Sequence, residues 1–353
     1  MLLVLAMAAA LWGIGAWMGT PKNARFTMIG ILYVAVLGLH VALPDGHPLR
    51  MATGESAALW LIFGGMVALV LIYREGLRRV RARAKTSQAV TEKPARTDAF
   101  SETELNRYAR HIVLREIGGA GQKRLKQARV LVIGAGGLGA PALQYLAAAG
   151  VGTIGVIDDD LVDNSNLQRQ VIHKDRSIGI PKVFSAEQEM VAQNPFVTVR
   201  PYHRRLTEEI ATELVQDYDL ILDGTDNFDT RYLVNRVAVA AGLPLISGAL
   251  SQWEGQLSVF DPAQGAPCYQ CVFSSAPAPE LAPSCAEAGV MGPLPGVIGS
   301  MMAVEAVKLL AGAGTPLRGQ IFIYDALYGE SRLITATRRA DCPVCGALES
   351  VAS

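Results

Sequence analysis

The stretch GAGGLGAPALQYLAAAG, residues Gly134 to Gly150, decides the fold class of this chain. It follows Val130–Ile133, a short apolar run rich in β-branched residues that is typical of a buried strand, and it continues into a pattern with helical spacing. A strand, a glycine turn and a helix in this order are typical of a Rossmann-type nucleotide site. The sequence therefore predicts a nucleotide-binding α/β domain.

Each glycine of the loop has an expected role. Gly134 permits a tight turn, Gly136 lets backbone N–H groups approach a phosphate, and Gly139 lets the helix pack on the strand. Gly137 belongs to the same loop, and the N-terminus of the following helix attracts anions. The next predicted strand ends in Asp158, whose carboxylate is placed to bond ribose hydroxyls. These residues leave open whether the loop holds a dinucleotide or ATP.

The N-terminal part of the chain is strongly apolar. Residues 2–19, 27–43 and 57–73 carry no charge, and each is near the lower length limit for crossing a hydrocarbon core of about 30 Å. A cleaved signal peptide would also explain the first segment, but that segment has no basic n-region. Buried core helices would explain the other two. We expect three transmembrane helices within residues 1–75.

Basic residues in the loops predict the orientation of these helices. Lys22 and Arg25 follow the first segment, Arg50 alone follows the second, and six Arg or Lys residues follow the third. By the positive-inside rule the N-terminus is outside, and the chain after Tyr73 is cytoplasmic. We therefore expect a multi-pass protein of the cytoplasmic membrane. A solvated linker explains the basic run equally well, and we assign residues 76–98 to a basic and polar linker.

A capping box, Ser101-Glu-Thr-Glu104, predicts a helix that continues through about Ile117. It marks the start of a domain over residues 99–348, which a tail at 349–353 follows. This C-terminal part carries 21 basic and 27 acidic residues, a net charge of −6, so we expect no nucleic-acid partner. Further helices and strands alternate along it, which predicts an α/β fold with a largely parallel sheet covered on both faces. The expected helices are 181–193, 208–215 and 227–241, and the expected strands are 153–157, 197–202, 220–222, 244–246 and 256–260.

Several motifs accompany the glycine loop in a fixed order. They are RYARHI at 107–112, DDD at 158–160, NLQRQ at 166–170, GIPK at 179–182, DGTDN at 223–227, EGQLSVF at 254–260 and AGVMGPLPGVIGS at 288–300. In these motifs the chain resembles the ThiF/HesA/MoeB family of ubiquitin-activating-type adenylyltransferases, from about residue 106 to residue 346. The resemblance implies a Rossmann-like adenylation domain.

The resemblance also implies a reaction. ATP binds with Mg²⁺, and the C-terminal glycine carboxylate of a ubiquitin-fold sulfur carrier protein ending in Gly-Gly attacks the α-phosphate. An acyl-adenylate and pyrophosphate result. A carboxylate is already a nucleophile at neutral pH, so the chemistry needs cations that align a polyanion rather than a general base. The family further implies a homodimer. No sulfurtransferase domain follows Cys345, so we expect a separate sulfur donor.

Matching motifs transfer roles to single residues. Arg169 and Lys182 hold the phosphates, Asp226 organises Mg²⁺, and Asp158 binds ribose. Ser165 and Asn166 match positions that line the nucleotide pocket. Arg110 matches an arginine that reaches across a dimer interface to the partner's ATP. Taken singly, an ordinary structural role explains several of these residues as well: a solvated helix residue for Arg110, a surface lysine for Lys182, and a helix N-cap for Asp226.

The cysteines form a second pattern. Cys268 and Cys271 make one CxxC pair and Cys342 and Cys345 another, the ligand set of a closed tetrahedral zinc site. Disulfides are disfavoured in reducing cytoplasm, and neither pair opens a helix after a strand as in a thioredoxin motif. We therefore expect structural Zn²⁺. Cys285 matches a family cysteine that bonds covalently to the carrier in some members and is dispensable in others, so a nucleophile and a bystander thiol both remain open.

Two features depart from the family pattern. The membrane segment is unusual for the family. In the DGTDN motif at 223–227, Gly224 replaces a cysteine that many relatives carry. Two other functions stay open. A nicotinamide-dependent oxidoreductase would leave Arg169 and Lys182 without a purpose, and a non-catalytic membrane-anchored scaffold would bind nucleotide or carrier without turnover. The sequence does not indicate whether the product serves molybdopterin, thiamine or another pathway.

Overall fold

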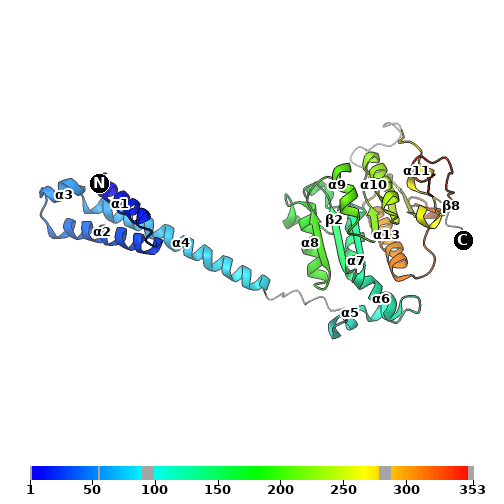
Figure 1. Cartoon of the computed structure of the whole chain (residues 1–353), viewed down its shortest axis with the longest axis horizontal. Helices are drawn as coiled ribbons and strands as arrows, with labels where there is room; N and C mark the ends of the chain where they lie inside the picture. The colour runs from blue at the N-terminus through cyan, green and yellow to red at the C-terminus, as the bar shows by residue number, and fades with distance from the viewer. Residues whose placement is uncertain (1, 55, 90–98, 278–287, 349–353) are drawn as a thin grey trace. The chain divides into compact units, whose positions relative to one another are not determined.

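The computed structural model describes residues 2–54, 56–89, 99–277 and 288–348. The chain divides into two compact units, Met1–Glu92 and Lys93–Ser353. The first unit is helical, and its helices are α1 (Leu2–Trp17), α2 (Lys22–Ala42), α3 (Pro48–Thr53) and α4 (Ala57–Ala89), as Figure 1 shows.

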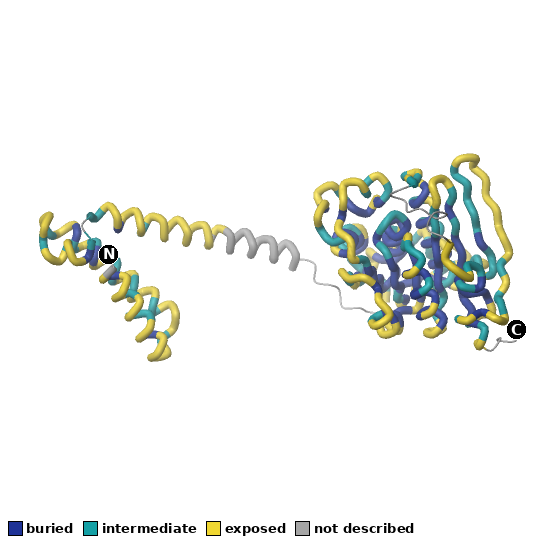
Figure 2. The backbone as a smooth tube through the Cα atoms, turned by 90° about the horizontal axis from the view of Figure 1, so that it is seen from above, coloured by how far each residue is buried: buried dark blue, intermediate teal, exposed yellow. Residues whose placement is uncertain are grey.

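The helices of the first unit match the three apolar segments. Lys22–Ala42 and Pro48–Arg74 are long and apolar enough to cross a membrane, whereas Leu3–Trp17 is shorter. Most of their described residues are exposed within the unit (Figure 2), and many of these are large apolar residues. α4 continues without a break from the third apolar segment into the basic run.

The second unit is built on one eight-stranded sheet with the order β3-β2-β1-β4-β5-β6-β7-β8. Strands β1 to β5 pair in parallel, and β5 to β8 pair antiparallel. The prediction of a largely parallel sheet is thus right for the first five strands and wrong for the last three. The strands are β1 (Arg129–Ile133), β2 (Thr153–Ile157), β3 (Thr198–Tyr202), β4 (Leu220–Asp223), β5 (Leu245–Leu250), β6 (Glu254–Phe260), β7 (Gln320–Asp325) and β8 (Glu330–Thr335).

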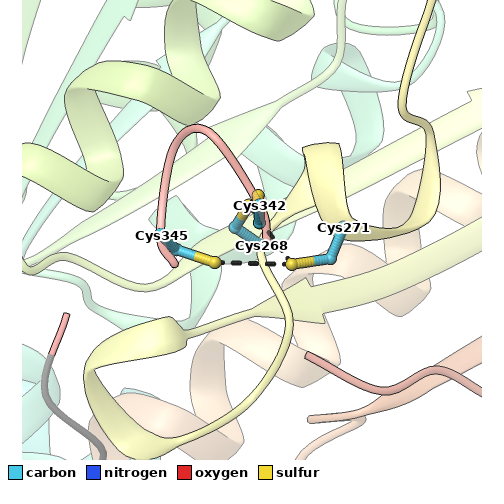
Figure 3. Close-up of side chains that lie close together, drawn as sticks. All are labelled: Cys268, Cys271, Cys342 and Cys345. Atoms are coloured by element: carbon cyan, nitrogen blue, oxygen red, sulfur yellow. Dashed lines mark hydrogen bonds between the residues drawn. The ribbon is translucent and has the colours of Figure 1, made fainter. Parts of the chain in front are cut away.

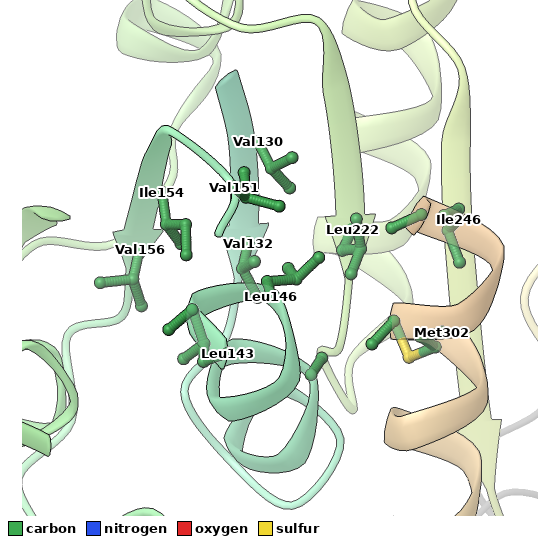
Figure 4. Close-up of a cluster of buried hydrophobic side chains, with 14 of the residues drawn as sticks. Val130, Val132, Leu143, Leu146, Val151, Ile154, Val156, Leu222, Ile246 and Met302 are labelled. Carbon is green, nitrogen blue, oxygen red and sulfur yellow. The ribbon is translucent and has the colours of Figure 1, made fainter. Parts of the chain in front are cut away.

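Helices cover both faces of the sheet, as predicted. Alternate residues of β1 enter two different cores: Val130 and Val132 pack with residues of α7 and α13, and Leu131 and Ile133 pack with residues of α9 and α10. Figure 4 shows the first of these cores. The helices of this unit are α5 (Glu102–Ile112), α6 (Gly118–Gln127), α7 (Gly139–Ala149), α8 (Lys182–Gln193), α9 (Glu208–Val215), α10 (Phe228–Ala241), α11 (Tyr269–Val272) and α13 (Pro293–Ala311).

Helix α5 is shorter than expected, and helix α13 is apolar but packs within the sheet domain. The capping box at Ser101 is present, but α5 ends at Ile112, five residues before the expected end. The chain then turns, and Gly118 at φ +60° opens α6, a conformation that ends a continuous helix. α13 is also long and apolar enough for a membrane span, yet half of it is buried and it packs against α7, β5 and β6. We therefore assign α13 to the core of the sheet domain.

Candidate functional site

A cavity of about 1040 Å³ opens at the carboxyl ends of the parallel strands. β1 pairs with β2 on one side and with β4 on the other, so the connections leave β1 in opposite directions along the sheet. Open α/β sheets bind ligands at such a reversal point. The cavity brings together most of the residues expected to bind nucleotide. Those that line it are Gly134, Gly136, Gly137, Asp158, Arg169, Lys182 and Asp226.

The glycine loop is held by two side chains that bind the backbone of one residue, Ala135. The backbone N–H of Ala135 donates to Oδ2 of Asp158 at 2.7 Å, and its carbonyl oxygen lies 2.9 Å from Nε2 of His173. Nδ1 of His173 lies 3.0 Å from the hydroxyl of Ser185. Burial lowers the pKa of His173, which favours the neutral ring, so Nε2–H donates to the loop and Nδ1 accepts from Ser185.

The close approach of three glycines explains the departure at Gly224. A Cβ built on Gly139 would lie 1.9 Å from the carbonyl oxygen of Gly134, so the helix packs directly on the loop. A Cβ on Gly224 would lie 3.1 Å from the backbone N of Gly139 and 3.3 Å from the Cβ of Leu138. A cysteine at this position would require these neighbours to shift by a few tenths of an ångström. Gly224 therefore fits the packing, and no catalytic role is needed to explain it.

The carboxylates after β2 are tied to a buried cation. Burial raises the pKa of Asp158, while the charge of Lys182 and the backbone N–H groups of Ala135 and Asp160 act against that rise. Nζ of Lys182 lies 2.7 Å from Oδ2 of Asp160. The Lys182 side chain is 6% exposed and that of Asp160 is 66% exposed. The exposed carboxylate of Asp160 therefore holds the buried ammonium group of Lys182 in the cavity wall.

Arg169 is positioned from its own segment. Its guanidinium donates to Oδ1 of Asn166 at 2.8 Å and to the carbonyl oxygen of Ser165 at 3.3 Å. The Ser165 hydroxyl donates in turn to Asp163 at 2.5 Å. Neither Ser165 nor Asn166 lines the cavity, so in this structure they support the arginine.

A buried ion pair that the sequence analysis missed shapes the loop carrying Asp226. Arg231 lies 3.6 Å from Oδ2 of Asp223, and both side chains are almost fully buried. Arg231 also donates to the carbonyl oxygens of Thr225 and Gly248. Asp226 itself is exposed, and the N-cap of α10 is Asn227, so capping does not explain Asp226.

Like Ser165 and Asn166, Arg110 and Gly139 do not line the cavity. Arg110 is exposed on α5, and Gly139 is buried behind the loop. Cys285 lies outside the described residues, although Pro277 and Ala288, the described residues on either side of that gap, both line the cavity. The cavity also contains residues that the sequence analysis did not name, among them Gln170, Arg204, Arg205 and Arg231. The two arginines after β3 were detectable, since the carboxyl ends of parallel strands meet at one edge.

The four paired cysteines meet at a second site (Figure 3). All four are buried, and the Cys268–Cys342, Cys271–Cys345 and Cys268–Cys271 sulfurs lie 3.6, 3.4 and 3.8 Å apart. Disulfide sulfurs lie about 2.05 Å apart, whereas four sulfurs at about 2.3 Å from one zinc ion lie about 3.8 Å from each other. The described cluster therefore has the spacing of a tetrahedral metal site.

One backbone N–H group and one side-chain amide lie beside this cluster. The N–H of Arg339 lies 3.4 Å from the sulfur of Cys271, and Nδ2 of Asn235 lies 3.8 Å from that of Cys268. Such N–H groups stabilise thiolates, the ligand form that a metal requires. The cluster joins residues 268–271 to residues 342–345.

Comparison with known proteins places this domain among adenylyltransferases. The ThiF family matches residues 108–344. A sulfur carrier protein adenylyltransferase of Thermus thermophilus is 50% identical over 251 residues, covering 70% of this chain and 93% of the relative. The SAMP-activating enzyme E1 of Haloferax volcanii is 47% identical over 250 residues, covering 71% and 92%.

Solved structures share the fold. A crystal structure of E. coli MccB with AMPCPP and MccA matches with a TM-score of 0.61 at 23% identity, covering 70% of this chain and 76% of that one. A structure of PaaA matches with a TM-score of 0.60 at 22% identity, covering 75% and 83%.

Proposed function

The chain belongs to the ThiF family, and from that premise we propose that it adenylylates the C-terminal glycine carboxylate of a ubiquitin-fold sulfur carrier protein. The observation that carries the proposal is the convergence of Asp158, Arg169, Lys182 and Asp226 on one cavity beside the glycine loop. Relatives named for this activity share about half of the aligned residues.

The proposed reaction uses few protein groups. A carboxylate oxygen of the carrier attacks the α-phosphorus of ATP, and the bond from this phosphorus to the oxygen bridging it to the β-phosphate breaks. An acyl-adenylate forms, and pyrophosphate leaves. Arg169 and Lys182 neutralise charge that develops on the phosphates, and Asp158 bonds ribose. Asp226 is an exposed carboxylate on the cavity wall, a hard oxygen ligand suited to the Mg²⁺ that accompanies ATP.

The cysteine cluster is proposed as a structural zinc site. Its spacing fits Zn²⁺, and four cysteine ligands would complete a tetrahedral shell, so a metal bound here would have no open position for a substrate. Bound metal would fasten the C-terminal segment to the middle of the domain. We also propose a homodimer, because Arg110 does not line the cavity of its own subunit and the matching family arginine acts in trans.

The N-terminal unit is proposed to anchor the enzyme as a multi-pass segment with residues 74–353 in the cytoplasm. Length and hydropathy of α2 and of Pro48–Arg74 support this, as do the basic residues after the third segment. A reporter active only outside the cytoplasm should be silent when fused after residue 90 and active when fused after residue 46. The reverse pattern would overturn the topology and would leave the domain without cytoplasmic ATP.

The activity is tested by isotope exchange with the full chain in detergent. Supplied with Mg²⁺, labelled pyrophosphate and a ubiquitin-fold carrier ending in Gly-Gly, the protein should exchange label into ATP. The same carrier without its last glycine is the matched control and should support no exchange. Nucleotide binding without exchange with every carrier would favour a scaffold, and tight binding of NAD without exchange would favour an oxidoreductase.

A further inference from the structure

Gln170 is a buried residue of the cavity whose backbone is held independently of its side chain. It is 4% exposed, and it lines the cavity next to Arg169. Its N–H donates to the carbonyl oxygen of Asn166 at 3.0 Å, and its own carbonyl accepts from the N–H of His173 at 3.0 Å. A substitution at this position therefore leaves both backbone bonds available.

The side-chain amide of Gln170 is poorly satisfied in the unliganded protein. Its Oε1 is buried and accepts no hydrogen bond within the part of the chain that the structure describes. A buried acceptor without a partner destabilises the folded state, and an apolar side chain of the same length would avoid that cost. The packing of the protein itself thus gives no reason for an amide here.

The other end of the amide borders the glycine loop. A Cβ built on Gly136 would lie 3.7 Å from Nε2 of Gln170, and among the described residues other than its two chain neighbours it would meet no other atom within 4 Å. The space above this glycine is therefore open, and an N–H donor stands at its edge. A phosphate seated on the loop would occupy that space.

We propose that Gln170 is a nucleotide-binding residue whose Nε2–H donates a hydrogen bond to a phosphate oxygen on the glycine loop. The proposal rests on the proposed function, because it takes the cavity as the ATP site. Arg169 and Lys182 supply charge there, whereas a neutral amide supplies a directed donor without adding a cation. The amide then positions the polyphosphate relative to the two cations.

Binding and stability of two matched variants of the full chain test this role. Gln170→Met should melt at or above the wild-type temperature without nucleotide, since it removes the unpaired oxygen. It should bind ATP about 10-fold or more weakly, the usual effect of losing a hydrogen bond to a charged group, and adenosine unchanged. Gln168→Met, an exposed glutamine outside the cavity lining, should leave all three measurements at wild-type values.

A charge variant gives a second readout. Gln170→Glu places a carboxylate beside the phosphate and should weaken ATP binding more than Gln170→Met does, again without an effect on adenosine. Unchanged ATP affinity in Gln170→Met, or an equal loss for ATP and adenosine, would overturn the phosphate contact while the proposed function stands. Wild-type protein that binds neither ligand would overturn both.

Discussion

The ammonium group of Lys182 lies 2.7 Å from the carboxylate of Asp160, and the lysine is buried while the aspartate is exposed. This pair holds a cation in the wall of the cavity before any phosphate arrives. Lys182→Ala and Arg169→Ala should therefore each lower the rate of ATP–pyrophosphate exchange by about 10²-fold or more, because each removes one charge contact to the transition state. Initial exchange rates at saturating ATP measure the effect.

Matched controls come from the same region. Lys174 is half-buried and Arg176 is exposed, both interact with Glu189, and neither lines the cavity. Lys174→Ala and Arg176→Ala should keep most of the exchange activity. Equal losses in the cavity variants and these controls would point to general charge or folding effects and would contradict the assigned roles.

The buried pair of Arg231 and Asp223 should be important for stability. Arg231→Met leaves the Asp223 carboxylate buried beside an apolar group, and such losses typically cost about 3–5 kcal/mol of unfolding free energy. Urea denaturation of the full chain in detergent measures the change. Arg236→Met, on the same helix, breaks an exposed pair with Glu208 and should cost about 1 kcal/mol or less. A similar loss of unfolding free energy in the two variants would show that the buried pair is no more important for stability than the exposed one.

His173 predicts a pH dependence of stability. Burial, together with the charges of Lys182 and Lys174, holds its pKa below the ordinary value of 6.5, so the unfolded chain binds a proton more readily than the folded one. The stabilisation is complete above about pH 6.5 and is lost as pH falls below it. Unfolding free energies measured between pH 7.5 and about 5 should decline, and His173→Gln should show a shallower decline. An identical slope in this variant would assign the pH dependence to other groups.

Much of the nucleotide half of the domain could be predicted from the sequence, because local patterns specify it. The run Val130–Ile133 and the glycines after it form a strand, a turn and a helix in the expected order, with Gly134 at φ +90°. Helices α8, α9 and α10 begin within one residue of their expected starts. Asp158, Arg169, Lys182 and Asp226 lie at one cavity because strand ends meet there.

The second half of the sheet was harder to predict, because long-range packing decides it. α13 is apolar on most sides and was not assigned, since a buried helix lacks the periodicity of an amphipathic one. β7 and β8 pair antiparallel at the edge, and every residue of β8 is exposed, so no apolar alternation marks that strand. Arg231 lies inside a helical pattern, where its contact with Asp223 is invisible in the sequence.

The cysteine cluster predicts a metal-dependent fold. The full chain should contain about one zinc ion, and Cys342→Ser should release it and lower the melting temperature, because structural zinc contributes directly to folding. Elemental analysis and thermal unfolding measure the two effects. Cys285→Ser changes a cysteine outside the two CxxC pairs and should keep the metal. Wild-type protein that contains no metal and has the same melting curve as Cys342→Ser would contradict the zinc site.

The position of Arg110 predicts complementation between subunits. Arg110 is exposed on α5 and does not line the cavity of its own chain, so a catalytic role requires that it reach the site of a partner. Arg110→Ala should then lower exchange by about 10²-fold or more, as Lys182→Ala does. In a mixture of equal amounts that has exchanged subunits, half of the dimers carry one variant of each kind, and each of these has one intact site. Exchange activity should return to about a quarter of the wild-type value. Full activity of Arg110→Ala alone would show that Arg110 is a solvated residue of α5 without a catalytic role. A mixture without activity would show that the arginine acts within its own subunit.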